Sequence, residues 1–309
     1  MLSVAQALGY RPSSAARVLA TGKGHARSMG FVMESYVPLG TYYGDILRGA
    51  EAEARREGYD LYFSTAYHNL AVLGQGSKPR DLYGQAVRGV VFAGEAPSGF
   101  HEAMTQAGIR VVHVNSYPAG YPVDCVMCDN FAASYRAVRW LLGLGHRDVA
   151  CIGLPAQPER GVPPSIEERM MGYRQALADA GIACRDDLVE WGDSLPEHGA
   201  AAMDRLARVR PRPTAVFATV DELAVGAIAQ ATRLGLAVPE DLSIMGVNDL
   251  EMARRTNPPL TTIRIPTEDM GRAAVQRALE LMREPNQRPR RIEVLTELVT
   301  RGSCGAAPK

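Results

Sequence analysis

Residues 213–218 read Pro-Thr-Ala-Val-Phe-Ala, and residues 221–227 read Asp-Glu-Leu-Ala-Val-Gly-Ala. The first run is short and apolar, which favours a buried strand over 214–218. The second run places apolar residues at helical spacing, which predicts a helix over 222–234 that ends at Gly235. An apolar strand follows at 242–247. Short buried strands that alternate with amphipathic helices are typical of parallel sheets covered by helices on both faces.

The same alternation runs along the rest of the chain in two similar halves. Strands are expected at 29–33, 59–64, 89–93, 109–114 and 123–127, and then at 148–153, 188–191, 214–218 and 242–247. Helices are expected at 42–57, 99–107, 131–144, 166–180, 196–209, 222–234 and 267–282. Residues 258–263 read as a return crossing, after which strands within 291–300 are shared between the halves. The sequence therefore predicts an α/β protein of two similar lobes, with ligands at the carboxyl ends of the strands.

The composition is typical of a globular protein, and its balance of charge argues against a uniformly basic protein. The chain has 309 residues, of which 46% are hydrophobic, and 34 Lys and Arg balance 34 Asp and Glu. The charge is uneven, because the first acidic residue is Glu34 and several basic residues precede it. This basic N-terminal segment favours contact with nucleic-acid phosphates from that end of the chain, and a solvated tail is the alternative. We see neither a membrane-spanning run nor a secretion signal, so we expect a cytoplasmic protein with no membrane partner.

Motifs of catalysis and metal binding do not stand out. Cys125 and Cys128 are spaced as in some metal sites, but they lie in an apolar strand with no second pair nearby, so we interpret them as core thiols. Nucleotide-binding, nucleophile-elbow and zinc-protease motifs are missing from the sequence. We therefore expect no catalytic residues, no metal and no cofactor, and a protein that is not an enzyme.

Residues 9–22 form a short helix-prone stretch near the N-terminus. Pro12 and the serines after it favour a helix start, and Gly22 ends the run. A helix this short is unstable in isolation, so it forms only when something holds it. An ordinary capped surface helix is the alternative to a functional role.

Several blocks in order resemble the lactose-repressor (LacI/GalR) family. They lie at 8–12, 144–147, 168–173, 213–218, 221–227, 235–246 and 258–262, and the order Ala-Ala-Arg-x-Leu within 15–19 is similar to the hinge helix of that family. The resemblance implies a two-lobed, type I periplasmic-binding-protein-like fold preceded by a short hinge helix. It also implies a ligand-responsive transcriptional repressor that works as a homodimer on operator DNA through hinge closure around an effector. A solute-binding protein of sugar transport, which shares this fold, is the alternative.

The resemblance assigns domains and DNA contacts. Residues 1–27 would be the remnant of a DNA-binding domain and the hinge helix. Residues 28–147 with 264–290 would form the N-terminal lobe, residues 148–263 with 291–303 the C-terminal lobe, and 304–309 a tail. The residues implied to touch DNA are Tyr10, Arg11, Ala16, Arg17 and Leu19. Because most of the family's helix-turn-helix module has no counterpart here, we expect this chain to bind operator DNA weakly.

The resemblance also implies an effector site in the cleft between the lobes. Its residues are Tyr42, Tyr43, Asp45, Asp129, Arg169, Trp191, Val220, Asp221 and Asn248. Arg169 aligns with the arginine that grips ligands in the family, and a surface arginine paired with Glu167 or Glu168 is the alternative. Asp129 is also a good helix cap, and capping is the expected role of Asp221. A buried core position is the alternative for Trp191.

Two positions depart from the sugar-binding members. Val220 stands where they usually have Asn, and Asn248 stands where they usually have Asp. Valine cannot form a hydrogen bond through its side chain, and asparagine lacks the charge of aspartate. We therefore expect an effector other than a typical neutral hexose, either a less hydroxylated sugar derivative or an anion.

Overall fold

The computed structural model describes residues 27–33, 41–65, 87–94, 96, 99–117, 122–155 and 162–308. The chain divides into two compact units. The first unit contains residues 1–126 and 268–292, and the second contains residues 127–267 and 293–309. The predicted lobe boundary at residue 147 differs from this division, because helix α6 packs against α7 of the second unit. Among the described residues no helix is long and apolar enough to cross a membrane.

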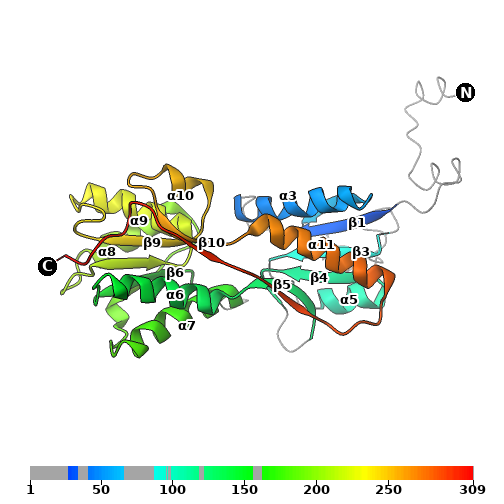
Figure 1. Cartoon of the computed structure of the whole chain (residues 1–309), viewed down its shortest axis with the longest axis horizontal. Helices are drawn as coiled ribbons and strands as arrows, with labels where there is room; N and C mark the ends of the chain where they lie inside the picture. Colours follow the sequence, from blue (N-terminus) through cyan, green and yellow to red (C-terminus); the bar gives the residue numbers. More distant parts are fainter. Residues whose placement is uncertain are drawn as a thin grey trace, which may run out of the picture. The chain divides into compact units, whose positions relative to one another are not determined.

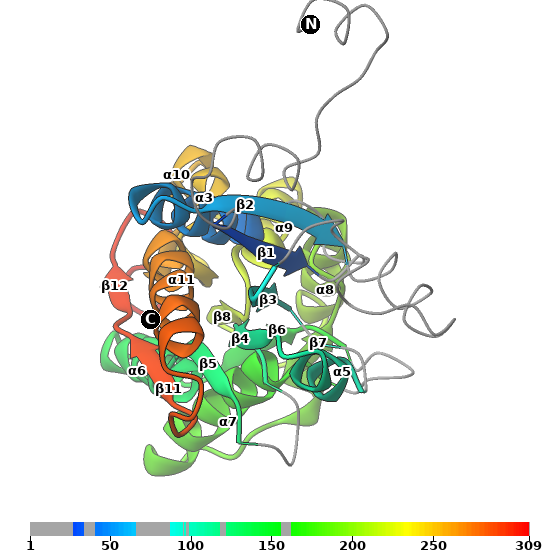
Figure 2. The ribbon, with the colours of Figure 1, turned by 90° about the vertical axis from the view of Figure 1, so that its right-hand side faces the viewer.

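The first unit is built on one six-stranded sheet in the order β11-β5-β4-β3-β1-β2. Its elements are β1 (Ser28–Met33), α3 (Thr41–Arg56), β2 (Asp60–Thr65), β3 (Gly89–Ala93), α5 (Phe100–Gln106), β4 (Arg110–Val114), β5 (Asp124–Cys128), α11 (Thr267–Arg283) and β11 (Arg291–Val294). Helices α3 and α11 lie side by side on one face of the sheet, and α5 covers the other face (Figures 1 and 2). The strand pairs β2–β1, β1–β3, β3–β4 and β4–β5 are all parallel.

The second unit repeats this plan with a sheet in the order β12-β10-β9-β8-β6-β7. Its elements are β6 (Val149–Gly153), α7 (Pro164–Asp179), a 3₁₀ turn (Asp186–Leu188), β7 (Val189–Trp191), α8 (Pro196–Leu206), β8 (Ala215–Ala218), α9 (Asp221–Arg233), β9 (Ser243–Asn248), α10 (Glu251–Arg255), β10 (Thr261–Arg264) and β12 (Glu297–Val299), with α6 (Asn130–Gly143) beside α7. Helices α8 and α9 pack together, as do α6 and α7 (Figure 1).

Close helix packing in the second unit depends on glycine. A Cβ on Gly226 of α9 would clash with the carbonyl oxygen of Pro196 at the start of α8. A Cβ on Gly172 of α7 would likewise clash with the carbonyl oxygen of Phe131 in α6. These glycines let the helix backbones meet, which fixes the helices on each side of the sheet.

The predicted fold class is confirmed, with three differences in detail. The strands within 291–300 are shared between the two sheets as expected, since β11 joins the first and β12 the second. Strand β12 runs antiparallel to β10, so the second sheet is not wholly parallel. Helix α10 was not predicted, and residues 258–263 were predicted only as a crossing, whereas β10 pairs there with β9.

The cysteine prediction is confirmed. Cys125 and Cys128 are buried in β5, where Cys125 is 4% exposed and Cys128 is 0% exposed. Burial raises the pKa of the Cys128 thiol. Within the described parts of the chain, no group of three or more His, Cys, Asp or Glu side chains could hold a metal ion.

Candidate functional site

Arg169 lies near the start of α7 and is only 2% exposed. Its Nε donates to Asn130 Oδ1 at 2.9 Å, and its Nη1 donates to the carbonyl oxygen of Thr219 at 2.6 Å and to Asn248 Oδ1 at 3.3 Å. We call these four residues the Arg169 cluster. The alternative of a surface arginine paired with Glu167 or Glu168 is wrong, because its partners come from α6 and from the ends of β8 and β9.

Two carboxylates, those of Glu168 and Glu222, lie near this cluster. Asn130, which is fully buried, also donates through Nδ2 to Glu168 Oε2 at 3.2 Å. Glu222, the second residue of α9, has one carboxylate oxygen that is buried and has no hydrogen-bond partner among the described residues. Burial raises the pKa of Glu222, although its own backbone amide, Ser194 and Arg169 act to lower it. Glu222 was not predicted as a site residue, because an acidic residue in a first helical turn is ordinary.

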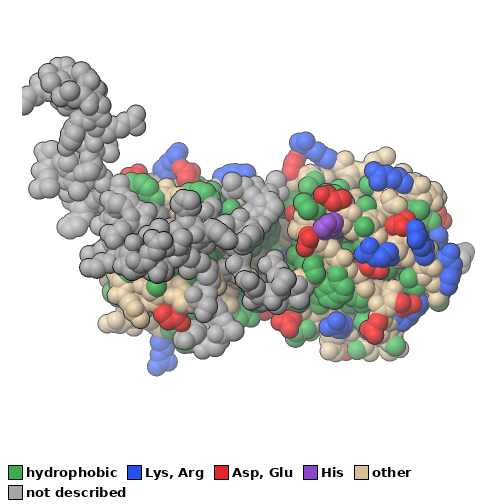
Figure 3. Space-filling view, turned by 180° about the vertical axis from the view of Figure 1, so that it is seen from behind, with side chains coloured by type: hydrophobic (Ala, Val, Ile, Leu, Met, Phe, Trp, Pro, Cys, Tyr) green, Lys and Arg blue, Asp and Glu red, His purple; other side chains and the backbone are tan. Residues whose placement is uncertain are grey.

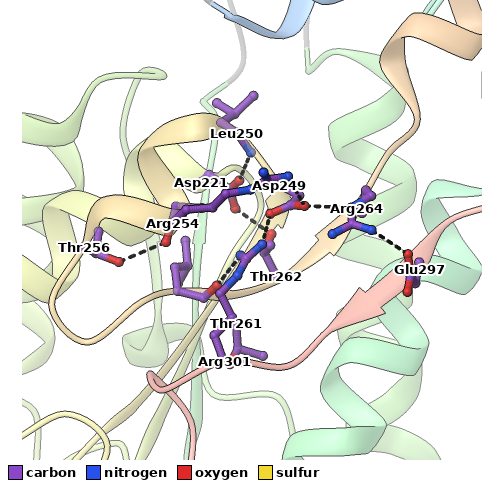
Figure 4. Close-up of polar contacts among 12 residues, drawn as sticks. Asp221, Asp249, Leu250, Arg254, Thr256, Thr261, Thr262, Arg264, Glu297 and Arg301 are labelled. Atoms are coloured by element: carbon purple, nitrogen blue, oxygen red, sulfur yellow. Dashed lines mark hydrogen bonds and ion pairs between the residues drawn. The ribbon is translucent and has the colours of Figure 1, made fainter.

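Asp221 is fully buried and does not cap its helix. The N-cap position of α9 belongs to Val220, which forms no side-chain capping bond, so the expected capping role of Asp221 is wrong. Asp221 instead accepts hydrogen bonds from the backbone amide of Leu250 at 2.7 Å and from Thr262 Oγ1 at 2.6 Å. Burial raises the pKa of Asp221 to about 7, and the two hydrogen bonds offset this only in part. The carboxyl thereby connects α9 to the segment that follows β9 and to β10 (Figure 4).

Three arginines bind the side chain of Asp249, which is only 1% exposed. Arg264 Nε lies 2.7 Å from Asp249 Oδ2, and Arg301 Nη2 lies 2.5 Å from Asp249 Oδ1. Arg254 is a more distant partner, at 3.5 Å. We call these four residues the Asp249 cluster (Figure 4). Burial acts to raise the pKa of Asp249, but the hydrogen bonds and charges of Arg301 and Arg264 prevail and lower it.

In the first unit, Tyr42 and Tyr43 meet a buried asparagine. The Tyr42 hydroxyl donates to Asn115 Oδ1 at 3.0 Å, and Asn115 Nδ2 donates to the Tyr43 hydroxyl at 3.2 Å. The two rings are arranged edge to face, with centroids 5.1 Å apart. Asn115 directly follows β4, and the adjacent Ser116 donates to the carbonyl oxygen of Gly94. Asn115 was not predicted, because nothing in the sequence pairs it with residues some seventy positions away.

Two further predicted residues of the effector site have local partners. Asp45 forms an ion pair with Arg48, one turn along α3, at 2.8 Å. Asp129 caps α6 by accepting from the backbone amide of Ala132 at 2.8 Å, which confirms the capping role. An effector contact at either residue stays a prediction.

Trp191 is 40% exposed, so the alternative of a buried core tryptophan is wrong. Its ring packs against Gly153, and the residue borders an open hollow of about 300 Å³ in the second unit. The hollow is lined by Pro155, Trp191, Gly192, Asp193, His198, Ala201 and Arg205. No member of the Arg169 cluster lines it. Figure 3 shows charged side chains of both signs, a histidine and apolar side chains on a face of this unit.

A contact between two histidines is a second unpredicted feature, in the first unit. His113 in β4 is fully buried, and its Nε2 lies 3.3 Å from Nδ1 of His101 in α5. Among the described residues, none forms a hydrogen bond with His113 Nδ1. Burial lowers the pKa of His113 to about 3, and the nearby His101 adds to the effect. The predicted DNA contacts Tyr10, Arg11, Ala16, Arg17 and Leu19 lie outside the described residues.

The two doubly wound sheets, each with polar clusters at the carboxyl ends of its strands, define a two-lobed periplasmic-binding-protein-like domain. Residues 138–304 match the family model of the periplasmic binding protein-like domain. The HTH-type transcriptional repressor PurR of Erwinia tasmaniensis is 32% identical over 308 residues, which cover 97% of this chain and 86% of that protein. PurR of Yersinia pestis bv. Antiqua (strain Antiqua) is also 32% identical, over 305 residues, with the same coverage of 97% and 86%.

Solved structures agree with these relatives. The transcriptional regulator CelR in its complex with cellobiose has a TM-score of 0.78 and 28% identity, covering 94% of this chain and 91% of that chain. A LacI transcriptional regulator from Bacillus cereus subsp. cytotoxis has a TM-score of 0.80 at 22% identity, covering 91% and 99%, and supports the fold.

The chain belongs to the LacI family of transcriptional regulators. It is a repressor of the LacI/PurR type with an effector-binding domain, and the relatives support this over the solute-binding alternative. The relatives and structures named above are described as regulators and not as enzymes.

Proposed function

We propose that this repressor responds to a small, neutral, hydroxyl-bearing effector, a sugar or a sugar derivative, which binds to Arg169 in the second unit. The observation that supports this is the fixed geometry of the guanidinium. Nε and Nη1 are held by protein acceptors, and none of the described residues accepts a hydrogen bond from Nη2. A held guanidinium offers its remaining donors in a defined direction, which suits a hydroxyl or carbonyl oxygen.

The charge around Arg169 favours a neutral effector over the anion that the sequence also allowed. Asn248 does replace a carboxylate at this point, but Glu168 and Glu222 stand close by. Glu222 also offers the buried oxygen without a partner, which suits a hydrogen-bond donor on the effector. An effector with adjacent hydroxyl groups supplies both an acceptor for Arg169 and a donor for Glu222.

The other partners follow from the family. We propose that the two compact units are the two lobes of the effector-binding domain, that the chain acts as a homodimer, and that its operator contacts come from Tyr10, Arg11, Ala16, Arg17 and Leu19. Tyr42, Tyr43, Asp45, Asp129, Trp191, Val220, Asp221 and Asn248 remain proposed effector contacts. The proposal includes no catalytic step and no cofactor.

A thermal-shift screen of the full chain tests the effector class. The panel holds neutral sugars including cellobiose and D-ribose, the sugar acid D-glucuronate, and the nucleoside adenosine. A ligand at a hundred times its Kd stabilises the folded state by about 2.7 kcal/mol, which is a clear shift in Tm. We expect a neutral sugar to give the shift and Arg169→Met to abolish it, while Arg174→Met, an exposed arginine on the same helix, preserves it.

Operator binding completes the test. DNA selected by the full chain from a random duplex pool is used to measure affinity with and without the sugar that gave the shift. A change in affinity that Arg169→Met removes supports the proposal. Stabilisation by D-glucuronate alone would show that the charge argument is wrong, and stabilisation by adenosine alone would overturn the sugar class.

A further inference from the structure

Asn248 and Asp249 are consecutive residues that belong to different clusters. Asn248, the last residue of β9, accepts from Arg169, whereas Asp249 binds arginines of β10 and of the segment after β12. Both residues have positive φ, 123° for Asn248 and 60° for Asp249. Non-glycine residues in this region are uncommon, and they persist where the surroundings hold them.

Several contacts hold this dipeptide in place, and Figure 4 shows those of Asp249. The carbonyl oxygen of Asn248 accepts from the amide of Ile265 at 3.4 Å, and the amide of Leu250 donates to Asp221. Asp249 adds charged contacts, because its two carboxylate oxygens are bound separately by Arg264 and Arg301. Charge-assisted hydrogen bonds of this kind are stronger than those between neutral groups.

Arg264 and Arg301 link Asp249 to β10 and to the segment just after β12. Arg264 is the last residue of β10, which is followed by α11 of the first unit, and Arg264 Nη1 also donates to Glu297 of β12 at 2.8 Å. Arg301 lies just beyond β12. Asp249 is therefore tied to both strands next to the chain connections, while its neighbour Asn248 touches Arg169.

We propose that Asp249 is a positioning residue for the effector site. By binding Arg264 and Arg301 it fixes the backbone of Asn248, and Asn248 in turn orients the guanidinium of Arg169. The Arg169 cluster is thus coupled to β10 and β12 through one dipeptide. The importance of this coupling for regulation rests on the proposed function, but the coupling itself can be measured without any effector.

The test follows side-chain hydrogen exchange in the full ¹⁵N-labelled chain. The Nε–H of Arg169, which donates to Asn130, reports the Arg169 cluster, and the backbone amide of Val216 in the buried strand β8 reports global opening. Asp249→Asn is the informative variant, because asparagine also tolerates a positive φ but lacks the charge. Glu297→Gln is the matched control, since it removes a charge that binds Arg264 but not Asp249.

We expect Asp249→Asn to accelerate exchange at Arg169 Nε–H by about tenfold, as loss of a charge-assisted hydrogen bond predicts, with Val216 unchanged. Glu297→Gln should leave both sites unchanged. Arg264→Gln, which keeps the Arg301 contact, should give a smaller acceleration and serves if Asp249→Asn fails to fold. Equal acceleration at Val216 would mean simple destabilisation and would overturn the proposal, as would an unchanged Arg169. A sugar screen without a hit would contradict the proposed effector and leave this result intact.

Discussion

Asn115 in the first unit and Asn248 in the second occupy equivalent positions in their sheets. Each lies at the carboxyl end of the fourth strand of its sheet, counted from β2 or β7, and each has a positive φ, 62° and 123°. Their partners differ. Asn115 joins the phenols of Tyr42 and Tyr43, whereas Asn248 joins the guanidinium of Arg169.

The same backbone feature thus supports an uncharged network in one unit and a charged network in the other. A buried guanidinium is costly without acceptors and opposite charge nearby, and the second unit places Glu168 and Glu222 beside the Arg169 cluster. In the first unit burial keeps His113 neutral, and the buried guanidinium of Arg277 is paired with Asp124. The two units should therefore respond differently to substitution and to pH.

Arg169→Met should give the largest effect. It leaves Asn130, Asn248 and the carbonyl oxygen of Thr219 without their buried donor, so the second unit should lose about 3 kcal/mol of unfolding free energy. Both tryptophans, Trp140 in α6 and Trp191 in β7, lie in this unit, so urea unfolding followed by their fluorescence reports it. Arg174→Met is the control and should change stability by less than about 0.5 kcal/mol. Similar losses in both variants would contradict the comparison.

Asp221 should make the second unit less stable as the pH rises. The folded-state pKa is about 7, above the ordinary 3.8, so the protonated carboxyl is favoured by folding. The stability that it contributes is complete below about pH 4 and is lost as the pH rises through 7. Between pH 5 and pH 6.5, wild type should lose about 2 kcal/mol relative to Asp221→Asn.

Tryptophan fluorescence in urea at each pH measures this difference. Glu222, whose pKa is also raised, is present in both proteins and cancels. Parallel pH profiles for wild type and Asp221→Asn would show that the carboxyl is already ionised at low pH.

His113 should give the first unit the opposite dependence. Its pKa is about 3 in the folded state and 6.5 ordinarily, so its contribution is complete above pH 6.5 and is lost as the pH falls toward 3. Between pH 6 and pH 4.5 the loss should be about 2 kcal/mol, and His113→Leu should remove most of it. Hydrogen exchange of peptides that cover β4 measures the first unit, and β9 peptides report the second unit, whose stability should rise over the same range because of Asp221. An acid loss that persists in His113→Leu would place its origin elsewhere.

The fold could be predicted because it depends on local periodicity. The runs at 89–93 and 149–153 are apolar over the length of one strand, and the helices between strands show their buried faces in the sequence. Boundaries such as Phe100–Gln106 differed from the prediction by one residue at each end. α10 was missed because five residues are too few to display a helical period.

The site was less predictable, because its contacts join distant parts of the chain. The position of Arg169 came from a family resemblance, but its burial did not, since charged residues are usually exposed. Asp221 was interpreted as a cap because its partners, Leu250 and Thr262, lie in other elements. The Asp249 cluster combines Asp249, Arg254, Arg264 and Arg301, which no short motif could bring together.

Tyr42→Phe should give the smallest effect and tests the uncharged network alone. The variant keeps the ring, which packs edge to face on Tyr43, and removes only the hydroxyl that donates to Asn115. Loss of one neutral hydrogen bond should cost the first unit about 1 kcal/mol, a third of the cost of Arg169→Met in the second. Hydrogen exchange of β4 peptides measures this cost at pH 5 and pH 7. Because neither phenol nor amide ionises in this range, the cost should be equal at both pH values. A cost that changes with pH would mean that the Asn115 network also depends on charge, and the contrast between Asn115 and Asn248 would fail.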